Sequence, residues 1–452
     1  MTIADTVWGR LSRFNLPRTR RGRVRRRRGR FSLLATIATV RWAVLATGLA
    51  AAVWAVQFEM RTSWLEARLF TRLDRGMSFL LHPGASAAIR FPKGGPYDER
   101  LGYTALPGFL ASLAARHFAI ESQARWSPGL VRFVNAGGFP IYTEKARTGL
   151  EIFDRGGKRV YRARFPENAY RDFAEIPAPI VDSLLFIEDR YLLDPRDIER
   201  NAAVEWKRFS KALAGRVAGS ILPGLRAGGA STLATQIEKF RHSPGGRTGG
   251  TVEKMRQMLS ASARIYIDGA NTLGRRKAVL TAYLNTTPLS SRPDYGEVIG
   301  IGDALSLWYG TDFADANRLL RATPRNAAAL AKKGLIYRQV LSLLLAGRRP
   351  SYYLNANRPA LGLLTDRYLR LLGDAGVIDP ALRDAALAAR LEFRADPPLL
   401  GATLLDKATE ETRAKLVGLL KRPDFYKLDR LDLSVETSMD TAAQARVSAV
   451  LQ

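Results

Sequence analysis

Two adjacent carboxylates, Glu188 and Asp189, end an apolar run in the segment FIEDRY at residues 186–191. A carboxylate among apolar neighbours has a raised pKa, which suits a general base or a general acid. Neighbouring residues on a helix point about 100° apart, so Glu188 and Asp189 cannot both face one substrate. Taken alone, the segment is better explained by an ion pair with Arg190 or by a charge at a helix end.

A second segment, GGASTLATQIEK at residues 228–239, runs from two glycines through Ser231 and Thr232 into an expected helix. Hydroxyl side chains cap helix N-termini, and the free N–H groups and positive dipole end there attract anions. The segment predicts an anion site, and an ordinary capped helix is the alternative.

A cluster of basic residues follows this helix, within residues 239–256: Lys239, Arg241, Arg247, Lys254 and Arg256. Beside a membrane, such a cluster could hold a lipid-linked phosphate or pyrophosphate. The alternative is a solvated basic helix face.

The elements that must position these residues are mostly helical. Apolar residues recur at three- and four-residue steps in segments 177–193, 201–217, 231–241, 252–267, 275–285, 296–309 and 327–391. Before them, two apolar segments, 150–153 and 160–165, flank the turn-rich residues 154–158 and predict a short β-hairpin. Apolar and polar residues alternate over residues 431–437, and a short helical pattern follows them. The sequence therefore predicts a mainly α protein with a small β-hairpin.

The N-terminus predicts a membrane anchor. Residues 1–30 hold eleven arginines and one acid, and residues 31–58 are nearly continuously apolar, with Arg41 as their one charge. Arginines before an apolar span place the N-terminus in the cytoplasm, and Trp42 and Trp54 suit the two membrane interfaces. The hypothesis is an uncleaved signal anchor with the remaining chain exported; a cleaved signal peptide and a buried helix behind a basic arm are the alternatives. Residues 61–100 then read as a linker with an amphipathic helix, suited to a bilayer surface or to packing on its own domain.

The amino-acid composition limits which catalytic groups and which partners the chain can use. The 452 residues are 46% hydrophobic and 25% charged, with a net charge of +28, which favours an anionic partner. Eleven of the basic residues precede the span, so membrane topology explains them and nucleic-acid binding is not expected. Cysteine is absent, which excludes disulfides, thiolate zinc sites and a cysteine nucleophile. Histidine occurs only three times. Catalysis would therefore use carboxylates, hydroxyls and cations.

The order of the motifs behind the anchor is more specific than any one of them. Glu-Asp-Arg is followed by Gly-x-Ser-Thr-Leu-x-x-Gln-x-x-Lys, then by KMRQM at 254–258, VLTAYLN at 279–285 and Tyr295-Gly296. This series resembles the peptidoglycan glycosyltransferase family, the polymerising domain of class A penicillin-binding proteins and of monofunctional transglycosylases. The resemblance covers roughly residues 150–390.

The resemblance implies a lysozyme-like glycosyltransferase domain that polymerises lipid II into β-1,4 glycan strands and releases undecaprenyl pyrophosphate. Glu188 matches the general base that deprotonates the acceptor 4-hydroxyl before inverting attack on the donor. The residues that match substrate-binding positions, or stand close to them, are Asp189, Ser231, Thr232, Gln236, Lys239, Arg247, Arg256, Gln257 and Asn285. No nucleotide or redox cofactor is implied and no metal ligand is assigned, although a divalent cation (Mg or Mn) near the pyrophosphate is left open.

The departures from the family pattern leave a second hypothesis. The first motif lacks the usual histidine and glycine within residues 191–197, Gln257 replaces a second glutamate, and Thr281 replaces another acid. Glutamine cannot ionise, so it supplies no negative charge to a metal or a developing cation. The alternative is a catalytically weakened membrane scaffold of the same fold in cell-wall synthesis. A lytic muramidase is a further possibility of the lysozyme-like fold.

The expected organisation has five parts. They are a basic cytoplasmic tail (1–30), a transmembrane signal anchor (31–60), a membrane-proximal region (61–149), the glycosyltransferase domain (150–395) and a C-terminal linker (396–452). Residues 435–444 resemble the lead-in to a transpeptidase domain, and no Ser-x-x-Lys motif follows, so the linker is expected to be a relic or the sequence to end early. The expected location is the bacterial inner membrane, single-pass, with the catalytic domain in the periplasm. Expected partners are lipid II, the nascent glycan, the membrane and other cell-wall synthesis proteins.

Overall fold

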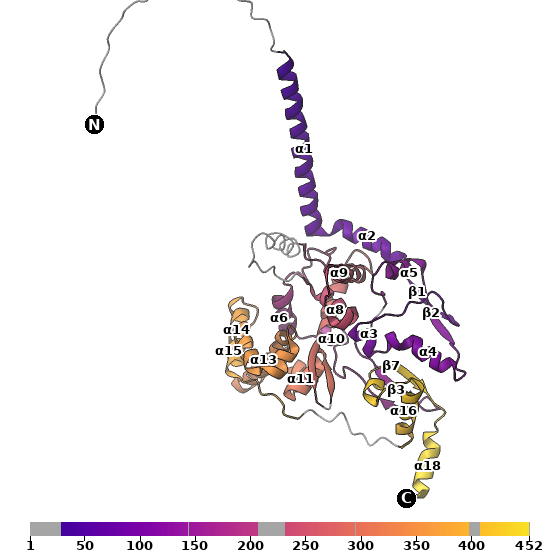
Figure 1. The fold of residues 1–452 in the computed structure, drawn as a ribbon. Coiled ribbons are helices and arrows are strands. Elements are labelled where there is room, and N and C mark those ends of the chain that lie inside the picture. The colour runs from indigo at the N-terminus through magenta and orange to yellow at the C-terminus, as the bar shows by residue number, and fades with distance from the viewer. Residues whose placement is uncertain (1–28, 143, 207–230, 294, 397–406, 452) are drawn as a thin grey trace, which may run out of the picture. The chain divides into compact units, whose positions relative to one another are not determined.

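The computed structural model describes residues 29–142, 144–206, 231–293, 295–396 and 407–451. It divides into two units, residues 1–58 and 59–452 (Figure 1). The chain is mainly helical with a few small sheets, as the sequence predicts.

The first unit is dominated by helix α1, Gly29–Thr62, which continues a few residues into the second unit. Its stretch Val40–Thr62 is long and apolar enough to cross a membrane. The side chains from Val40 to Phe58 are exposed, including Trp42 and Trp54. One helix of the described chain thus has the length and composition that the sequence predicts for an anchor.

The second unit opens with α2 (Trp64–Arg75). Ala67 and Phe70 are buried, and the Phe70 ring stacks on Tyr266 with a centroid distance of 5.8 Å. Leu65 and Leu69 are exposed. The predicted amphipathic helix therefore packs on its own unit through one face and leaves apolar side chains on the other.

The elements that follow are short up to residue 175. They are β1 (Phe79–Pro83), α3 (Pro96–Arg100), η1 (Tyr103–Ala105), α4 (Leu106–Ala114), β2 (Ser122–Trp126), α5 (Pro128–Asn135), β3 (Gly149–Phe153), β4 (Arg159–Arg162) and η2 (Phe173–Glu175). β1 and β2 form an antiparallel pair. β3 and β4 form the hairpin that the sequence predicts around the turn at 154–158.

The helical body follows. Its elements are α6 (Ala178–Glu188), α8 (Leu233–His242), η3 (Pro244–Gly246), α9 (Thr251–Ile265), α10 (Leu273–Thr286), β5 (Pro288–Arg292), β6 (Gly296–Ile299), α11 (Gly300–Tyr309), α12 (Phe313–Arg321), α13 (Ala327–Ala346), η4 (Tyr352–Ala356), α14 (Arg358–Asp374) and α15 (Pro380–Ala388). One continuous core joins them, and Trp308 and Tyr337 are among its fully buried side chains. α8 packs against both α9 and α10, which fixes the helix that carries the second motif.

Two predicted helices have different bounds in the structure. The helix expected at 177–193 ends at Glu188, because Asp189 adopts an extended conformation and its carboxylate accepts the Tyr191 N–H. The segment expected as one helix at 296–309 begins instead as strand β6, which pairs with β5. Gly296 and Gly300 have positive φ, so the chain turns on either side of that strand. Most of the helix expected at 201–217 lies outside the described residues.

The C-terminal segment contributes α16 (Lys407–Leu419), α17 (Phe425–Leu428), β7 (Asp432–Glu436) and α18 (Thr441–Leu451). β7 pairs in parallel with β3, so the sheet has the order β4-β3-β7. A second, smaller core lies against this sheet and includes Leu150, Ile152, Leu416 and Leu428. The alternating residues at 431–437 are therefore a strand of the same sheet as the hairpin.

Candidate active site

Glu188 is the last residue of α6. Its Oε2 accepts a 2.9 Å hydrogen bond from Gln236 Nε2 on α8, and its Oε1 lies 3.6 Å from the Arg348 guanidinium. The carboxylate side chain is 14% exposed. Glu188 therefore lies at the edge of the helical body, held between an amide donor and a cation.

The start of α8 shows why this helix begins where it does. The Thr232 side chain caps the helix by accepting the Thr235 N–H, and Thr235 Oγ1 accepts the Thr232 N–H in return. This capping box satisfies two of the free amides at the helix start. Just before it, Ser231 Oγ accepts a 2.9 Å hydrogen bond from Lys254 Nζ on α9. The predicted anion-site segment is therefore linked directly to the basic cluster.

Lys239 lies near the Glu188 carboxylate, and Lys254 lies near Lys239. Burial lowers the pKa of Lys239, and the negative charge of Glu188 partly offsets that effect. Burial together with the positive charge of Lys239 lowers the pKa of Lys254 to about 8. Each lysine is destabilised as a cation in this environment, so an added anion would relieve the repulsion between them.

The arrangement combines a carboxylate that can accept a proton with two closely spaced ammonium groups. A base of this kind can deprotonate a hydroxyl group, and the ammonium groups can stabilise the negative charge of a departing oxyanion. Among the described residues, no group of three or more His, Asp or Glu side chains is arranged to hold a metal ion.

The two other predicted cations lie differently. Arg256 Nε donates to the Gly137 carbonyl at 2.6 Å, and its guanidinium carbon lies 4.8 Å from the centre of the Phe139 ring. Arg247 is exposed and forms no ion pair with any residue that the structure describes. Arg256 is thus engaged by residues 137–139, whereas Arg247 is available to solvent.

Three of the predicted residues are buried and bonded within the protein. Asp189 accepts the Tyr191 N–H and lies 3.6 Å from Arg200. Asn285 holds the backbone of Tyr170 by accepting its N–H at 2.9 Å and donating to its carbonyl at 2.7 Å. Gln257, which is fully buried, donates to Ser243 Oγ and Thr248 Oγ1.

Two residues outside the predicted set touch the site. Lys254 belongs to the basic cluster at 239–256, and its bond to Ser231 places it beside the start of α8. Arg348 follows α13 and reaches Glu188 from 160 positions further along the chain. The cluster of charges at 239–256 pointed to Lys254, but no local pattern marks Arg348 as a neighbour of Glu188.

Behind the site, the opposite face of α8 belongs to a buried ionic cluster. His242 contacts Asp98 through Nδ1 at 2.8 Å and Glu144 through Nε2 at 2.5 Å. Arg264 on α9 bridges Glu144 and Glu238, at 2.7 Å to each carboxylate. Buried charges are stable only when paired in this way, so the cluster fixes α8 against α3 and α9.

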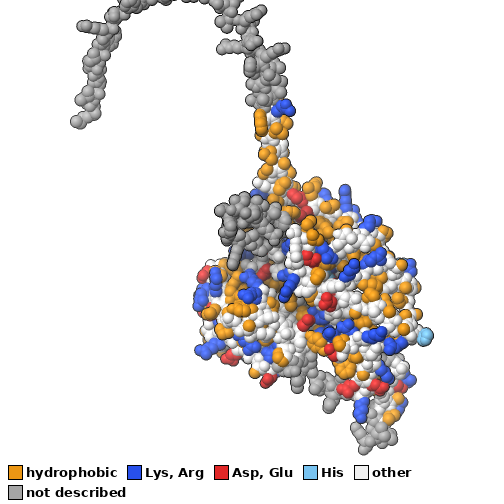
Figure 2. All heavy atoms as spheres, in the orientation of Figure 1, with side chains coloured by type: hydrophobic (Ala, Val, Ile, Leu, Met, Phe, Trp, Pro, Cys, Tyr) orange, Lys and Arg blue, Asp and Glu red, His pale blue; other side chains and the backbone are white. Residues whose placement is uncertain are grey.

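Basic side chains are otherwise spread over the visible face of residues 59–452 (Figure 2). The net positive charge therefore does not by itself mark the site. The site is marked by the contacts among α6, α8, α9 and the segment after α13.

Residues 157–365 match a family model described as transglycosylase. The matched segment begins in the β3–β4 turn, ends in α14 and contains Glu188, Gln236, Lys254 and Arg348. A search of curated proteins finds no match to this chain.

Proposed function

Because residues 157–365 belong to the transglycosylase family, whose activity is peptidoglycan glycosyl transfer, we propose that this chain polymerises lipid II into β-1,4 glycan strands and releases undecaprenyl pyrophosphate. In this proposal Glu188 is the general base. The single observation that carries it is the position of Glu188, whose carboxylate is held by Gln236 within one helical turn of Lys239.

The proposed step is an inverting displacement. The Glu188 carboxylate takes the proton of the acceptor 4-hydroxyl as that oxygen attacks the anomeric carbon of the donor. The bond between this carbon and the pyrophosphate oxygen breaks, and its electron pair leaves with the pyrophosphate. The Gln236 amide keeps one carboxylate oxygen in place, and in this proposal Oε1, which lies 3.6 Å from the Arg348 guanidinium, accepts the proton.

The leaving group carries negative charge that must be stabilised. Lys239 and Lys254 are the best placed cations, because both are partly buried and their charges repel each other without an anion between them. Arg247 and Arg256 are the further donor-site cations in the proposal. Ser231 and Thr232 belong to the same helix start, and Ser231 orients Lys254. The step requires no redox or nucleotide cofactor.

The proposed location is a bacterial inner membrane. α1 contains the candidate span Val40–Thr62, and the arginines before it favour a cytoplasmic N-terminus. The catalytic part would then face the periplasm, where the lipid-linked substrate is polymerised.

Purified full-length protein supplied with labelled lipid II tests the proposal. The wild-type chain should form glycan polymer, and Glu188→Gln should abolish the product while the protein keeps its melting temperature. Glu392→Gln, which changes an exposed glutamate outside the site, is the matched control and should leave the product unchanged. Undiminished polymer from Glu188→Gln would end the assignment of Glu188 as base.

The second candidate is a scaffold of the same fold, and it rests on Gln257 in place of the family's second glutamate. This candidate predicts that the folded wild-type chain makes no polymer from lipid II. Cleavage of preformed glycan without polymerisation would instead identify a lytic enzyme.

A further inference from the structure

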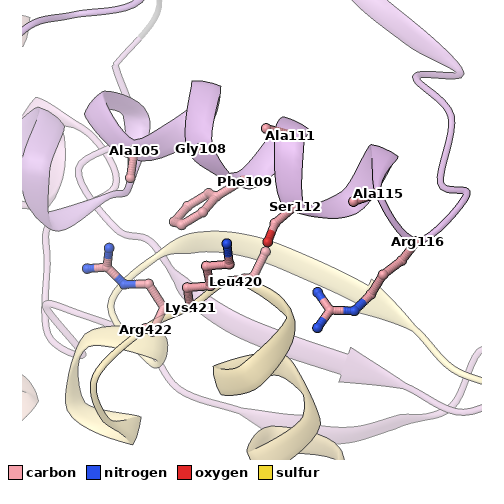
Figure 3. Close-up of a pocket in the computed structure, with 10 residues that line it drawn as sticks. All are labelled: Ala105, Gly108, Phe109, Ala111, Ser112, Ala115, Arg116, Leu420, Lys421 and Arg422. Atoms are coloured by element: carbon pink, nitrogen blue, oxygen red, sulfur yellow. The ribbon is translucent and has the colours of Figure 1, made fainter.

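A cavity of about 730 Å³ lies between α4 and the turn that follows α16 (Figure 3). Both walls lie outside residues 157–365, the part that matches the transglycosylase family. One wall is a face of α4 and the residues beside it, and the other is the turn formed by Leu420, Lys421 and Arg422. The cavity thus belongs to the part of the chain that the catalytic proposal leaves without a role.

The α4 wall is built from small side chains. Ala105, Gly108, Ala111 and Ala115 line the cavity together with the ring of Phe109. A Cβ atom built on Gly108 would have no atom within 4 Å. Small residues leave the α4 backbone accessible, so the backbone of another segment can approach it closely.

Among the described residues that line the same cavity, none is acidic and three are cations: Arg116, Lys421 and Arg422. None of the three forms an ion pair with a carboxylate of the described residues. Arg116 donates to the Leu419 carbonyl at 3.5 Å, and the Arg422 guanidinium carbon lies 5.7 Å from the centre of the Phe109 ring. The charge of the cavity is therefore positive and unneutralised within the described part of the chain.

The hydroxyl group of a mostly buried serine points into the same space. Ser112 is 7% exposed, and its side chain forms no hydrogen bond with any residue that the structure describes. Figure 3 shows its oxygen directed from α4 toward the turn at Leu420. The oxygen is not among the buried side-chain atoms without a partner, so it is reachable from the cavity and can form a hydrogen bond with a ligand there.

The cations are arranged along the cavity and do not converge on one point. In Figure 3, Arg422, Lys421 and Arg116 follow one another from one end of the cavity to the other. A single phosphate would be held by converging donors, as at a helix N-terminus. Cations in a row beside a wall of small residues suit a peptide segment that carries several carboxylates.

The backbone fixes this row of cations. Lys421 has a positive φ of 50°, the conformation that ends a helix, and the Arg422 N–H donates to the Val417 carbonyl at 2.9 Å. Leu416 and Leu420 belong to the second hydrophobic core. The turn is therefore anchored before any ligand binds.

From the unneutralised cations, the small-residue wall and the Ser112 hydroxyl that points into the cavity, we infer that the groove between α4 and residues 420–422 binds an acidic segment of a partner protein. Its carboxylates pair with Arg116, Lys421 and Arg422, and its backbone packs on the small residues of α4. The Ser112 hydroxyl donates to an oxygen of the segment. This function is independent of glycosyl transfer.

Binding can be measured with the full chain in detergent. The probe is a fluorescent amphipathic peptide of about 16 residues with glutamates on one face and alanines and leucines on the other, and its matched form carries glutamine at each glutamate. Fluorescence anisotropy should show binding of the glutamate peptide that is weaker by about tenfold or more for the glutamine peptide. The triple variant Arg116→Glu, Lys421→Glu and Arg422→Glu should lose binding to a similar extent.

A control variant with the same change in net charge distinguishes binding at this groove from a general attraction of the acidic peptide to a basic protein. Arg325→Glu, Arg367→Glu and Arg370→Glu alter exposed arginines of the helical body, and this triple variant should bind as the wild type does. Ser112→Ala should weaken binding by a few-fold without lowering the melting temperature. Equal losses in the two triple variants, or no binding by the wild type, would overturn the inference.

Because the chain contains no cysteine, a single introduced cysteine is the only thiol that reacts, and its protection by the peptide shows where the peptide binds. Single variants Ala111→Cys, in the cavity, and Ala328→Cys, on an exposed part of α13, can each be alkylated with a maleimide. The acidic peptide should slow alkylation at position 111 only. If vesicles of phosphatidylglycerol protect position 111 and the peptide does not, the groove binds lipid headgroups and the inference of a protein partner is wrong.

Discussion

Gln236 Nε2 donates a 2.9 Å hydrogen bond to Glu188 Oε2, and this bond joins the last residue of α6 to the second turn of α8. The two residues are 48 positions apart in the chain. The other carboxylate oxygen, Oε1, lies 3.6 Å from the Arg348 guanidinium. The predictions below follow from this contact and from the charges on both faces of α8.

Gln236→Leu should lower kcat by about tenfold or more, because the Glu188 carboxylate loses the donor that orients it. The melting temperature should change little, since the Gln236 side chain is only partly buried. Gln236→Glu should place a second carboxylate against Glu188 and move the acid limb of the pH–rate profile to higher pH, because like charges raise a carboxyl pKa. Unchanged kcat in both variants would exclude a role for this hydrogen bond in catalysis.

Lys254 should make kcat/KM depend on pH above neutrality. Burial and the charge of Lys239 lower the pKa of Lys254 to about 8, so the free enzyme loses this cation as the pH rises through that value. We expect kcat/KM for the pyrophosphate-linked donor to fall above about pH 8, since kcat/KM reports ionisations of the free enzyme. Lys254→Arg should move the fall to higher pH because arginine stays charged. A fall at the same pH in Lys254→Arg would show that another group is responsible.

Gln257→Glu should destabilise the protein. The Gln257 side chain is fully buried and donates to Ser243 Oγ at 2.9 Å and to Thr248 Oγ1 at 3.0 Å. A carboxylate cannot donate these bonds, so the free energy of unfolding should fall by about 2 kcal/mol. Thermal unfolding in detergent measures the loss, with Gln257→Met as the apolar control of similar length. A gain of polymer formation in Gln257→Glu at unchanged melting temperature would contradict this prediction and support the scaffold hypothesis.

His242 should make stability depend on pH. Burial by itself lowers the pKa of His242, but the carboxylates of Glu144 and Asp98 outweigh that effect and raise the pKa to about 9. The folded pKa lies above the unfolded value of about 6.5, so the stabilisation is complete below pH 6.5 and is lost as the pH rises through 9. The loss corresponds to about 3 kcal/mol for a shift of this size.

The measurement for His242 is a comparison of urea unfolding across this pH range for the wild type and for His242→Gln. The difference between the two should shrink as the pH rises, because only the wild type carries the titrating imidazole. Lys254 titrates in both proteins and cancels from the difference. A difference that is constant from pH 6 to 10 would be inconsistent with a protonated His242 in the fold.

The sequence by itself determined the features that depend on neighbours along the chain. The apolar run behind the arginines predicted α1, the turn residues at 154–158 predicted the β3–β4 hairpin, and the hydroxyl residues at 231–232 predicted the start of α8. These signals are local, because helix periodicity, turn chemistry and capping act over a few residues. The ordered motifs also identified the family that matches residues 157–365.

Only the tertiary structure decided which side chains meet. Arg348 reaches Glu188 across 160 positions, and β7 pairs with β3 from almost 300 positions away. Gln257 and Asn285 stand in motif positions, yet both are buried in hydrogen bonds to the protein. The physical reason is that burial and long-range contacts depend on how helices pack around one core, and the spacing of residues within a single segment does not carry that information.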